Sequence, residues 1–168
     1  KGEVPTRLLE GDPAAAKEAA DFYRAIFADD YYLEVMDNGI PEQKVLIPQL
    51  AALGKELGIE LVATNDTHYI RREDAKSQDV LLCIQTGKTL DEEKRMRFTG
   101  EEFYLKSPAE MIRLFAEFPE AIQNTLGIEE KCNLTIPLKR MYLPDFPVPE
   151  GETANGYLEK LCREGIAR

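Results

Sequence analysis

The chain has 168 residues, of which 43% are hydrophobic and 31% charged, as is ordinary for one soluble globular domain or slightly more. Its net charge of −10 argues against a surface that holds nucleic acid through phosphate contacts. No apolar run approaches the ~20 residues that cross a bilayer, and we expect neither a membrane span nor a secretory signal. Three scattered cysteines without CxxC spacing indicate reduced thiols and a cytoplasmic protein.

The chain begins with alternating helix and strand patterns. Residues 1–11 have no clear period and are interpreted as a loop. Asp12 before Pro13 predicts a helix start, because a capping acceptor precedes a residue with fixed φ, and apolar spacing extends this helix to about residue 27. The aromatic and β-branched residues 31–36 predict a strand.

A second helix and a second strand follow. Leucines recur at three- and four-residue spacing up to Leu57, and Gly58 is the expected end of this helix. Pro48 lies within the pattern, so the helix either starts near it or bends at it. Two successive strand–helix units predict a parallel α/β layout with right-handed crossovers.

Residues 59–69, with the sequence IELVATNDTHY, are the most informative stretch. The apolar first half predicts a buried parallel strand, and the polar second half contains Asp66 and His68, the only histidine in the chain. Side chains two residues apart on an extended segment point the same way, so this carboxylate and imidazole are expected side by side. Ligands and metals are held at the C-terminal ends of strands in α/β folds.

A structural interpretation of the same residues is the more common one. Asn65, Asp66 and Thr67 are good turn and cap residues, and a lone histidine after a strand is more often a structural hydrogen-bonding group. One Asp and one His do not complete a metal site, because even catalytic zinc usually takes three protein ligands. Asp66 and His68 are therefore candidate metal ligands in an incomplete set.

The pattern changes in the middle of the chain. A helix is predicted over residues 72–85. Residues 95–98 and 102–105 flank a Thr-Gly pair and are expected to form a short hairpin.

The last part of the chain predicts three helices and one connector. A capping box with proline at the first helical position opens a helix over residues 108–116, and another helix covers 119–132. Residues 137–151 hold four prolines and are interpreted as an extended connector. The final helix begins at Thr153 or Asn155.

Five blocks of sequence follow one another in a characteristic order: YYLEVMD (31–37), VATNDTHY (62–69), DVLLCIQTGK (79–88), FYLKSPAEM (103–111) and NTLGIEEKCNL (124–134). Together they closely resemble bacterial DNA polymerase III alpha subunits, in the later part of their PHP (polymerase and histidinol phosphatase) domain. The resemblance covers essentially the whole chain. It implies that residues 1–136 are the C-terminal portion of a PHP domain and residues 137–168 the connector and first helix of the polymerase core.

The resemblance implies a fold and a metal site. The fold is α/β, part of a PHP-type distorted parallel β/α barrel, followed by helices and a proline-rich connector. In this family the Asp-x-His motif, here Asp66 and His68, supplies two ligands of a metal cluster, for which zinc, manganese or iron is suitable. Family members with an intact cluster hydrolyse phosphoesters, including 3′–5′ exonuclease proofreading, whereas in others the domain is structural.

The chain holds only part of what the family pattern requires. The family's His-x-His motif, its other early ligands and a ligand cysteine are expected upstream of residue 1, and the aspartates that bind magnesium for polymerisation downstream of residue 168. None of the three cysteines matches the ligand cysteine, and Glu34 is expected to make a supporting hydrogen bond. The parent is expected to be a DNA-directed DNA polymerase and the isolated chain to be inactive, with no catalytic residue assigned.

The main functional hypothesis is a fragment of a replicative DNA polymerase that carries part of a metal-dependent phosphoesterase or exonuclease site. The alternatives are a non-catalytic module that docks the proofreading subunit, and a free-standing PHP phosphatase, which needs a complete ligand set. The implied partners are DNA, through the parent polymerase, the proofreading exonuclease subunit and other replicase subunits. Half a barrel leaves sheet edges and apolar surface uncovered, so we expect a covering partner or self-association.

Overall fold

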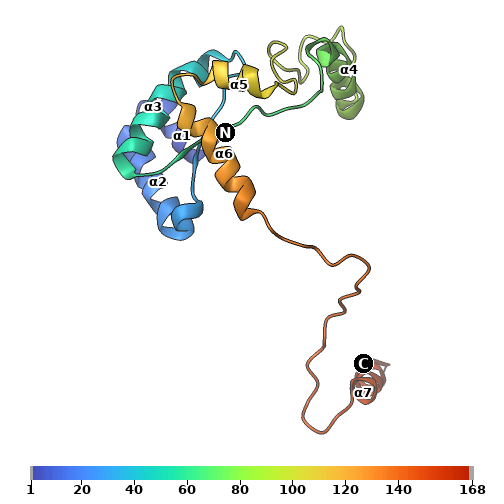
Figure 1. Ribbon diagram of the computed structural model, residues 1–168. Coiled ribbons are helices and arrows are strands. Elements are labelled where there is room, and N and C mark those ends of the chain that lie inside the picture. Colours follow the sequence, from blue (N-terminus) through green and yellow to red (C-terminus); the bar gives the residue numbers. More distant parts are fainter. Residues whose placement is uncertain (1, 167–168) are drawn as a thin grey trace. The chain divides into compact units, whose positions relative to one another are not determined.

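The computed structural model describes residues 2–166 and divides the chain into two compact units, Lys1–Cys132 and Asn133–Arg168 (Figure 1). The first unit combines helices with a small parallel sheet, so the predicted mixed α/β class is confirmed. The sheet of the described residues has two strands. The barrel therefore stays a prediction.

The sheet pairs β1 (Leu33–Val35) with β2 (Leu61–Ala63) in parallel, with Leu33 opposite Leu61 and Val35 opposite Ala63. The helix α3 (Pro41–Leu57) connects the two strands, as a parallel pair requires. Alternate residues of each strand are buried, and the C-terminal ends of both strands lie at the same edge of the sheet. Both predicted strands and their parallel pairing are confirmed.

The end of α3 is set by glycine. Gly58 adopts φ +67° at the helix C-terminus, where its missing Cβ allows the left-handed conformation, and the predicted stop is confirmed. The helix begins at Pro41, seven residues before Pro48, and passes through that residue. Pro48 therefore does not open the helix.

The chain opens with a helix where the sequence pattern predicted a loop. The helix α1 (Glu3–Leu9) buries Val4 and Leu8, which are four residues apart and therefore share one face. This face packs against α2 (Pro13–Phe27), whose start is capped by the Asp12 carboxylate accepting a hydrogen bond from the Ala15 amide at 3.0 Å. The loop prediction is wrong because two apolar residues in one short helix give no readable period, and packing on α2 stabilises the helix.

The core lies between the sheet, α1, α2 and α3, with contributions from the later helices. Its buried apolar members include Leu33, Val35, Leu50, Leu53, Leu57, Ile59, Leu61, Ala63 and Phe115. The carboxamide of Asn124 donates a hydrogen bond of 2.8 Å to the Leu61 carbonyl, and α6 (Pro119–Lys131) packs against β2. Because the Glu60 carbonyl faces β1, the next carbonyl along the strand points to the opposite edge, and α6 satisfies it there.

Two 3₁₀ turns and two further helices complete the elements described for the first unit. The 3₁₀ turns η1 (Ala28–Asp30) and η2 (Arg72–Asp74) precede β1 and α4 (Ala75–Thr86), respectively. The helix α5 (Pro108–Leu114) starts at the predicted capping box, in which Ser107 and Glu110 bond reciprocally. The helix predictions for this region are confirmed.

The predicted hairpin over residues 95–105 is wrong. Instead of pairing with residues 95–98, the segment around Tyr104 forms a parallel bridge with Tyr69. The Leu105 amide donates to the Tyr69 carbonyl at 3.0 Å, and the His68 amide donates to the Phe103 carbonyl at 2.8 Å. The long-range pairing brings residues 102–106 to the end of β2.

In the second unit, residues 133–149 form neither helix nor strand, and α7 (Ala154–Ile166) follows a turn. The Thr153 hydroxyl accepts a hydrogen bond from the Gly156 amide at 3.2 Å. Thr153 is therefore the cap of this helix, the first of the two predicted starts. No helix among residues 2–166 is long and apolar enough to cross a membrane.

Candidate metal centre

The segment that follows β2 turns sharply where the ladder ends. The Thr64 amide donates the last hydrogen bond to β1, reaching the Val35 carbonyl at 3.1 Å. Two residues later Asp66 adopts φ +46°, in the left-handed region that few residues other than glycine occupy. Aspartate is one of the side chains that tolerate this conformation, and such outliers cluster at functional sites.

The structure brings the two predicted ligands together. Asp66 Oδ1 lies 3.2 Å from His68 Nε2, and their side chains are 52% and 36% exposed. The expected juxtaposition at the C-terminal end of β2 is therefore present, but the left-handed Asp66 rather than an extended strand produces it. Both side chains are therefore partly exposed to solvent.

Two phenylalanine rings pack against the imidazole of His68. The His68 ring centroid lies 4.4 Å from that of Phe98 and 5.9 Å from that of Phe103. Phe103 is buried, and its carbonyl accepts the hydrogen bond from the His68 amide. Ring packing and the backbone bond together limit the rotation of His68, which leaves Nε2 directed at Asp66.

Asn65, directly before Asp66, is the centre of a polar network that joins three segments. Its carboxamide nitrogen donates to the Tyr104 carbonyl at 2.5 Å, and its own carbonyl accepts from the Asn38 carboxamide at 2.9 Å. Asn38 is 1% exposed and exchanges two further hydrogen bonds with Gln43, at 2.7 and 3.0 Å. These bonds satisfy a buried polar group that would otherwise be costly.

Lys106 approaches the same asparagine from the other side. Its Nζ donates to Asn65 Oδ1 at 2.8 Å and to the Glu102 carbonyl, and it lies 4.6 Å from the ring centroid of Tyr104. The Lys106 side chain is only 4% exposed. Burial lowers the pKa of this ammonium below its usual value, and the nearby Glu102 carboxylate opposes that shift.

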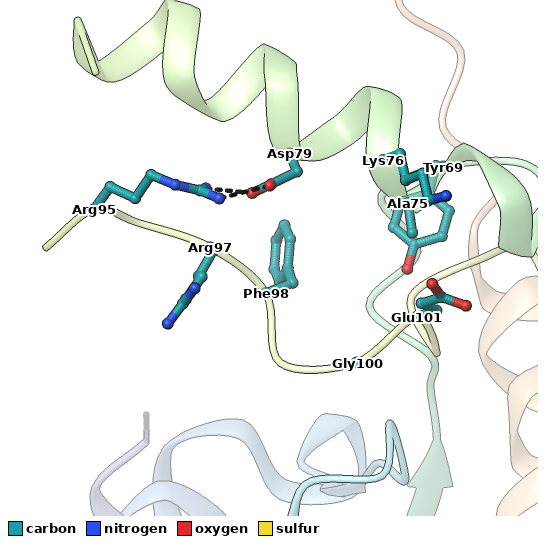
Figure 2. Close-up of a pocket in the computed structure, with 9 residues that line it drawn as sticks. All are labelled: Tyr69, Ala75, Lys76, Asp79, Arg95, Arg97, Phe98, Gly100 and Glu101. Carbon is teal, nitrogen blue, oxygen red and sulfur yellow. Dashed lines mark hydrogen bonds and ion pairs between the residues drawn. The ribbon is translucent and has the colours of Figure 1, made fainter. Parts of the chain in front are cut away.

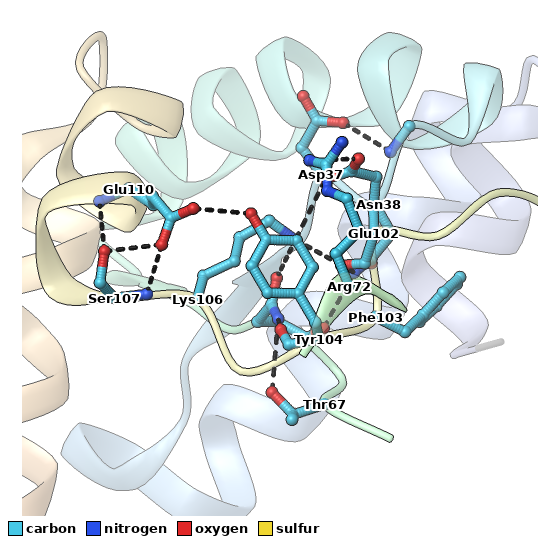
Figure 3. Close-up of polar contacts among 12 residues, drawn as sticks. Asp37, Asn38, Thr67, Arg72, Glu102, Phe103, Tyr104, Lys106, Ser107 and Glu110 are labelled. Carbon is cyan, nitrogen blue, oxygen red and sulfur yellow. Dashed lines mark hydrogen bonds and ion pairs between the residues drawn. The ribbon is translucent and has the colours of Figure 1, made fainter. Parts of the chain in front are cut away.

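The Tyr104 side chain continues the network to the start of α5 (Figure 3). Its hydroxyl donates to Glu110 Oε1 at 2.7 Å, and Glu110 also accepts from the amide and hydroxyl of Ser107. These hydrogen bonds, chiefly those from Ser107, lower the pKa of Glu110 from 4.5 to about 2. The capping box therefore anchors the segment that contacts Asn65.

Glu34 makes the supporting hydrogen bond expected from its place on β1. Its Oε1 accepts from the Thr64 hydroxyl at 2.7 Å, across the two strands at the edge where the candidate ligands lie. The three cysteines are free, and only Cys83 is buried. Within residues 2–166 no group of three or more His, Cys, Asp or Glu side chains is arranged to hold a metal ion. Asp66 and His68 thus supply two suitable donors, fewer than the usual catalytic set.

Two cavities flank the segment. The larger, of about 950 Å³, lies between residues 63–67, Lys106 and the apolar faces of α5 and α6. The smaller, of about 220 Å³, lies beside α4, and Figure 2 shows Tyr69, Phe98 and an Asp79–Arg95 ion pair around it. The Arg95 guanidinium, which is 6% exposed, donates to both carboxylate oxygens and lowers the pKa of Asp79. This pair ties the segment before Phe98 to α4.

The residues that surround the two candidate ligands are not predictable from local sequence patterns. Asn65 has the residue type of a turn, and Lys106 stands in one of the five family blocks without a role that its neighbours in sequence indicate. Both act through partners about 40 positions away in the sequence, which local patterns do not reveal. The only available signal was a lysine within an otherwise apolar and aromatic run.

Comparison with known proteins supports the resemblance. No protein-family model matches the chain. It is 42% identical over 167 residues to the DNA polymerase III subunit alpha of Treponema pallidum, covering 98% of this chain and 14% of that protein. It is 43% identical over 157 residues to the Deinococcus radiodurans subunit, covering 90% and 12%, and 48% identical over 132 residues to the Campylobacter jejuni subunit, covering 79% and 11%.

These similarities identify the proteins to which the chain is related. It is homologous, over nearly its whole length, to one segment of DNA polymerase III alpha subunits. The chain spans about one seventh of the length of the relatives that cover it most fully. The resemblance to DNA polymerase III alpha subunits, predicted from the five blocks, is therefore confirmed.

Proposed function

We propose that this chain is part of the PHP domain of a replicative DNA polymerase alpha subunit and that Asp66 and His68 are two ligands of its metal site. The observation that carries the proposal is the 3.2 Å approach of Asp66 Oδ1 to His68 Nε2 beyond the C-terminal end of a parallel strand. The homology to DNA polymerase III alpha subunits supports it independently. In this proposal residues 1–136 form the later part of a β/α barrel and residues 137–168 lead into the polymerase core.

The donor chemistry favours zinc, manganese or iron. A carboxylate and an imidazole suit these ions, and the exposed donor atoms leave access for one. A bound ion would lower the pKa of water and polarise a phosphoryl oxygen, as phosphoester hydrolysis requires. Two protein ligands are too few for a catalytic site, so the remaining ligands of that site come from elsewhere in the parent, and the chain alone is expected to hydrolyse no DNA.

Manganese binding tests this proposal. We expect Mn²⁺ to bind the chain and to broaden the NMR signals of the His68 ring, since manganese prefers oxygen and nitrogen donors over the exposed thiols. Asp66→Asn keeps a residue that tolerates positive φ, and His68→Phe keeps the ring packing on Phe98, so each removes little beyond one donor. Both variants should lose binding.

The matched control is Asp37→Asn. This carboxylate follows the neighbouring strand and accepts a hydrogen bond from the Gly39 amide at 3.0 Å. The control should bind Mn²⁺ as the unmodified chain does. Equal binding by all four proteins would exclude Asp66 and His68 as ligands.

A docking role is the second candidate, and the exposed apolar side chains of residues 133–149 favour it. Leu134, Leu138, Met141 and Leu143 are each at least three-quarters exposed in a segment without helix or strand. Exposed apolar side chains in such number indicate a surface for another polypeptide. In a replicase, the proofreading exonuclease subunit is the partner that we propose. Gel filtration with light scattering tests the prediction of a covering partner or self-association, and a compact monomer would contradict it.

A further inference from the structure

Lys106 is a buried cation whose ammonium group is already engaged within the protein. Its side chain is 4% exposed, and its Nζ is already engaged by Asn65 Oδ1, the Glu102 carbonyl and the face of Tyr104. The Glu102 carboxylate lies 3.6 Å away and offsets the charge. Burying a long cationic side chain costs free energy, so a lysine at this place requires a role that an apolar residue cannot fill.

The partner of Lys106 immediately precedes a candidate ligand. Asn65 precedes Asp66, the residue at φ +46°, whose conformation is unfavourable without support from its surroundings. Asn65 is held at its side chain by Lys106 and the Tyr104 carbonyl, and at its backbone carbonyl by Asn38. A residue restrained at both its backbone and its side chain fixes the direction in which the chain continues.

The same segment that carries Lys106 also holds His68. Phe103 accepts the hydrogen bond from the His68 amide, and the Leu105 amide donates to the Tyr69 carbonyl. Lys106 therefore connects the two sides of the turn: through Asn65 it contacts the strand end before Asp66, and through Glu102 the segment behind His68. Figure 3 shows the Lys106 side chain beside the Tyr104 ring.

We propose that Lys106 is a positioning residue that, through its hydrogen bond to Asn65, holds Asp66 and His68 in the arrangement that binds a metal. The inference rests on the proposed metal site and adds a residue that touches neither the ion nor its ligands. Residues that orient metal ligands from behind typically contribute ten- to a hundredfold in metal affinity.

The test compares Lys106→Met with Lys131→Met. Lys131 is a matched control, because its Nζ also makes several contacts, with the Asp29 carbonyl, Asp30 and the Tyr32 hydroxyl, and lies over the Tyr32 ring. It contacts the turn before β1 rather than the segment after β2. Two quantities are measured on the full 168-residue chain: amide hydrogen exchange at His68 and Leu105, and the dissociation constant for Mn²⁺.

Lys106→Met should speed amide exchange at His68 and Leu105 by about tenfold or more relative to Lys131→Met, and should weaken Mn²⁺ binding by about ten- to a hundredfold. Lys106→Arg, which keeps the charge and the donors, should recover part of both losses. If Lys106→Met does not fold, Lys106→Gln, which is neutral and shorter, takes its place in the same comparison.

The outcomes separate this inference from the proposed function. Unchanged exchange, or faster exchange with unchanged Mn²⁺ affinity, would overturn the positioning role while the metal site stands. Absence of Mn²⁺ binding in the unmodified chain would overturn the metal site in this chain. Without Mn²⁺ binding, either result for amide exchange in Lys106→Met overturns the inference. Unchanged exchange would show that Lys106 does not hold the segment, and faster exchange would show that its role is structural only.

Discussion

Alanine substitutions at two helical glycines, Gly54 in α3 and Gly127 in α6, are expected to have opposite effects on stability. A Cβ added at Gly54 would lie 2.7 Å from the backbone carbonyl oxygen of Ile59, and 3.5 Å from methyl carbons of Leu33 and Leu61. The Ile59 amide also donates to the Gly54 carbonyl at 2.9 Å, so the chain that leads into β2 is fixed there. Gly54→Ala therefore forces backbone movement rather than rotation of a flexible side chain.

The balance between helix propensity and close packing decides whether each substitution stabilises or destabilises the fold. Alanine gains about 1 kcal/mol over glycine inside a helix, whereas overfilling a packed site costs about 1–3 kcal/mol and more where backbone must move. We expect Gly54→Ala to lower the free energy of unfolding by about 1–2 kcal/mol. Gly127, in α6, has no heavy atom within 4 Å of an added Cβ, so Gly127→Ala should raise it by about 1 kcal/mol.

Urea unfolding followed by far-UV circular dichroism measures both changes, and the chain has no tryptophan to serve as an alternative probe. The Gly127→Ala variant is the control for helix propensity, because it makes the same substitution without the close contact. Equal stabilisation by both substitutions would refute the close approach of α3 to the start of β2.

Three further predictions follow from the core and the surface contacts. Phe115→Ala, at a side chain that is 2% exposed, should cost about 3–5 kcal/mol of unfolding free energy, measured by urea titration. Because the folded-state pKa of Glu110 is lowered from 4.5 to about 2, its contribution to stability is present above pH 4.5 and is lost on acidification toward pH 2; Glu110→Gln should therefore flatten the dependence of the melting temperature on pH in that window. Arg95→Met should release the segment before Phe98 from Asp79 and speed tryptic cleavage at Lys94 and Arg97. An unchanged cleavage rate would show that the ion pair does not hold this segment on α4.

Local signals in the sequence were sufficient for the elements that they specify. The cap at Asp12, the left-handed Gly58 and the capping box at Ser107 each place an acceptor or a permissive backbone where a helix must begin or end, and the structure has them there. The apolar run before Asp66 likewise specified a buried parallel strand. The proximity of Asp66 and His68 was expected from their spacing, but the left-handed conformation of Asp66, which the spacing does not reveal, produces it.

Long-range contacts decided the rest. The hairpin was expected from a Thr-Gly pair, but residues 103–105 gain more by pairing with the chain after β2, to which Tyr69 and the buried Phe103 belong. The helix α1 depends on a partner helix for its stability. Asn65 and Lys106 are separated by 41 positions, and no local pattern predicts their contact.

Anomalous diffraction at the zinc edge, from crystals of the chain soaked in zinc, tests whether Asp66 and His68 bind one metal ion. We expect a peak about 2.0–2.2 Å from a carboxylate oxygen of Asp66 and from Nε2 of His68. The two atoms now lie 3.2 Å apart. Binding of the ion would move them apart only slightly, because two ligand atoms of one tetrahedral zinc lie about that far from each other. Zinc found only at the exposed Cys132 or Cys162, or no peak beside His68, would contradict the account.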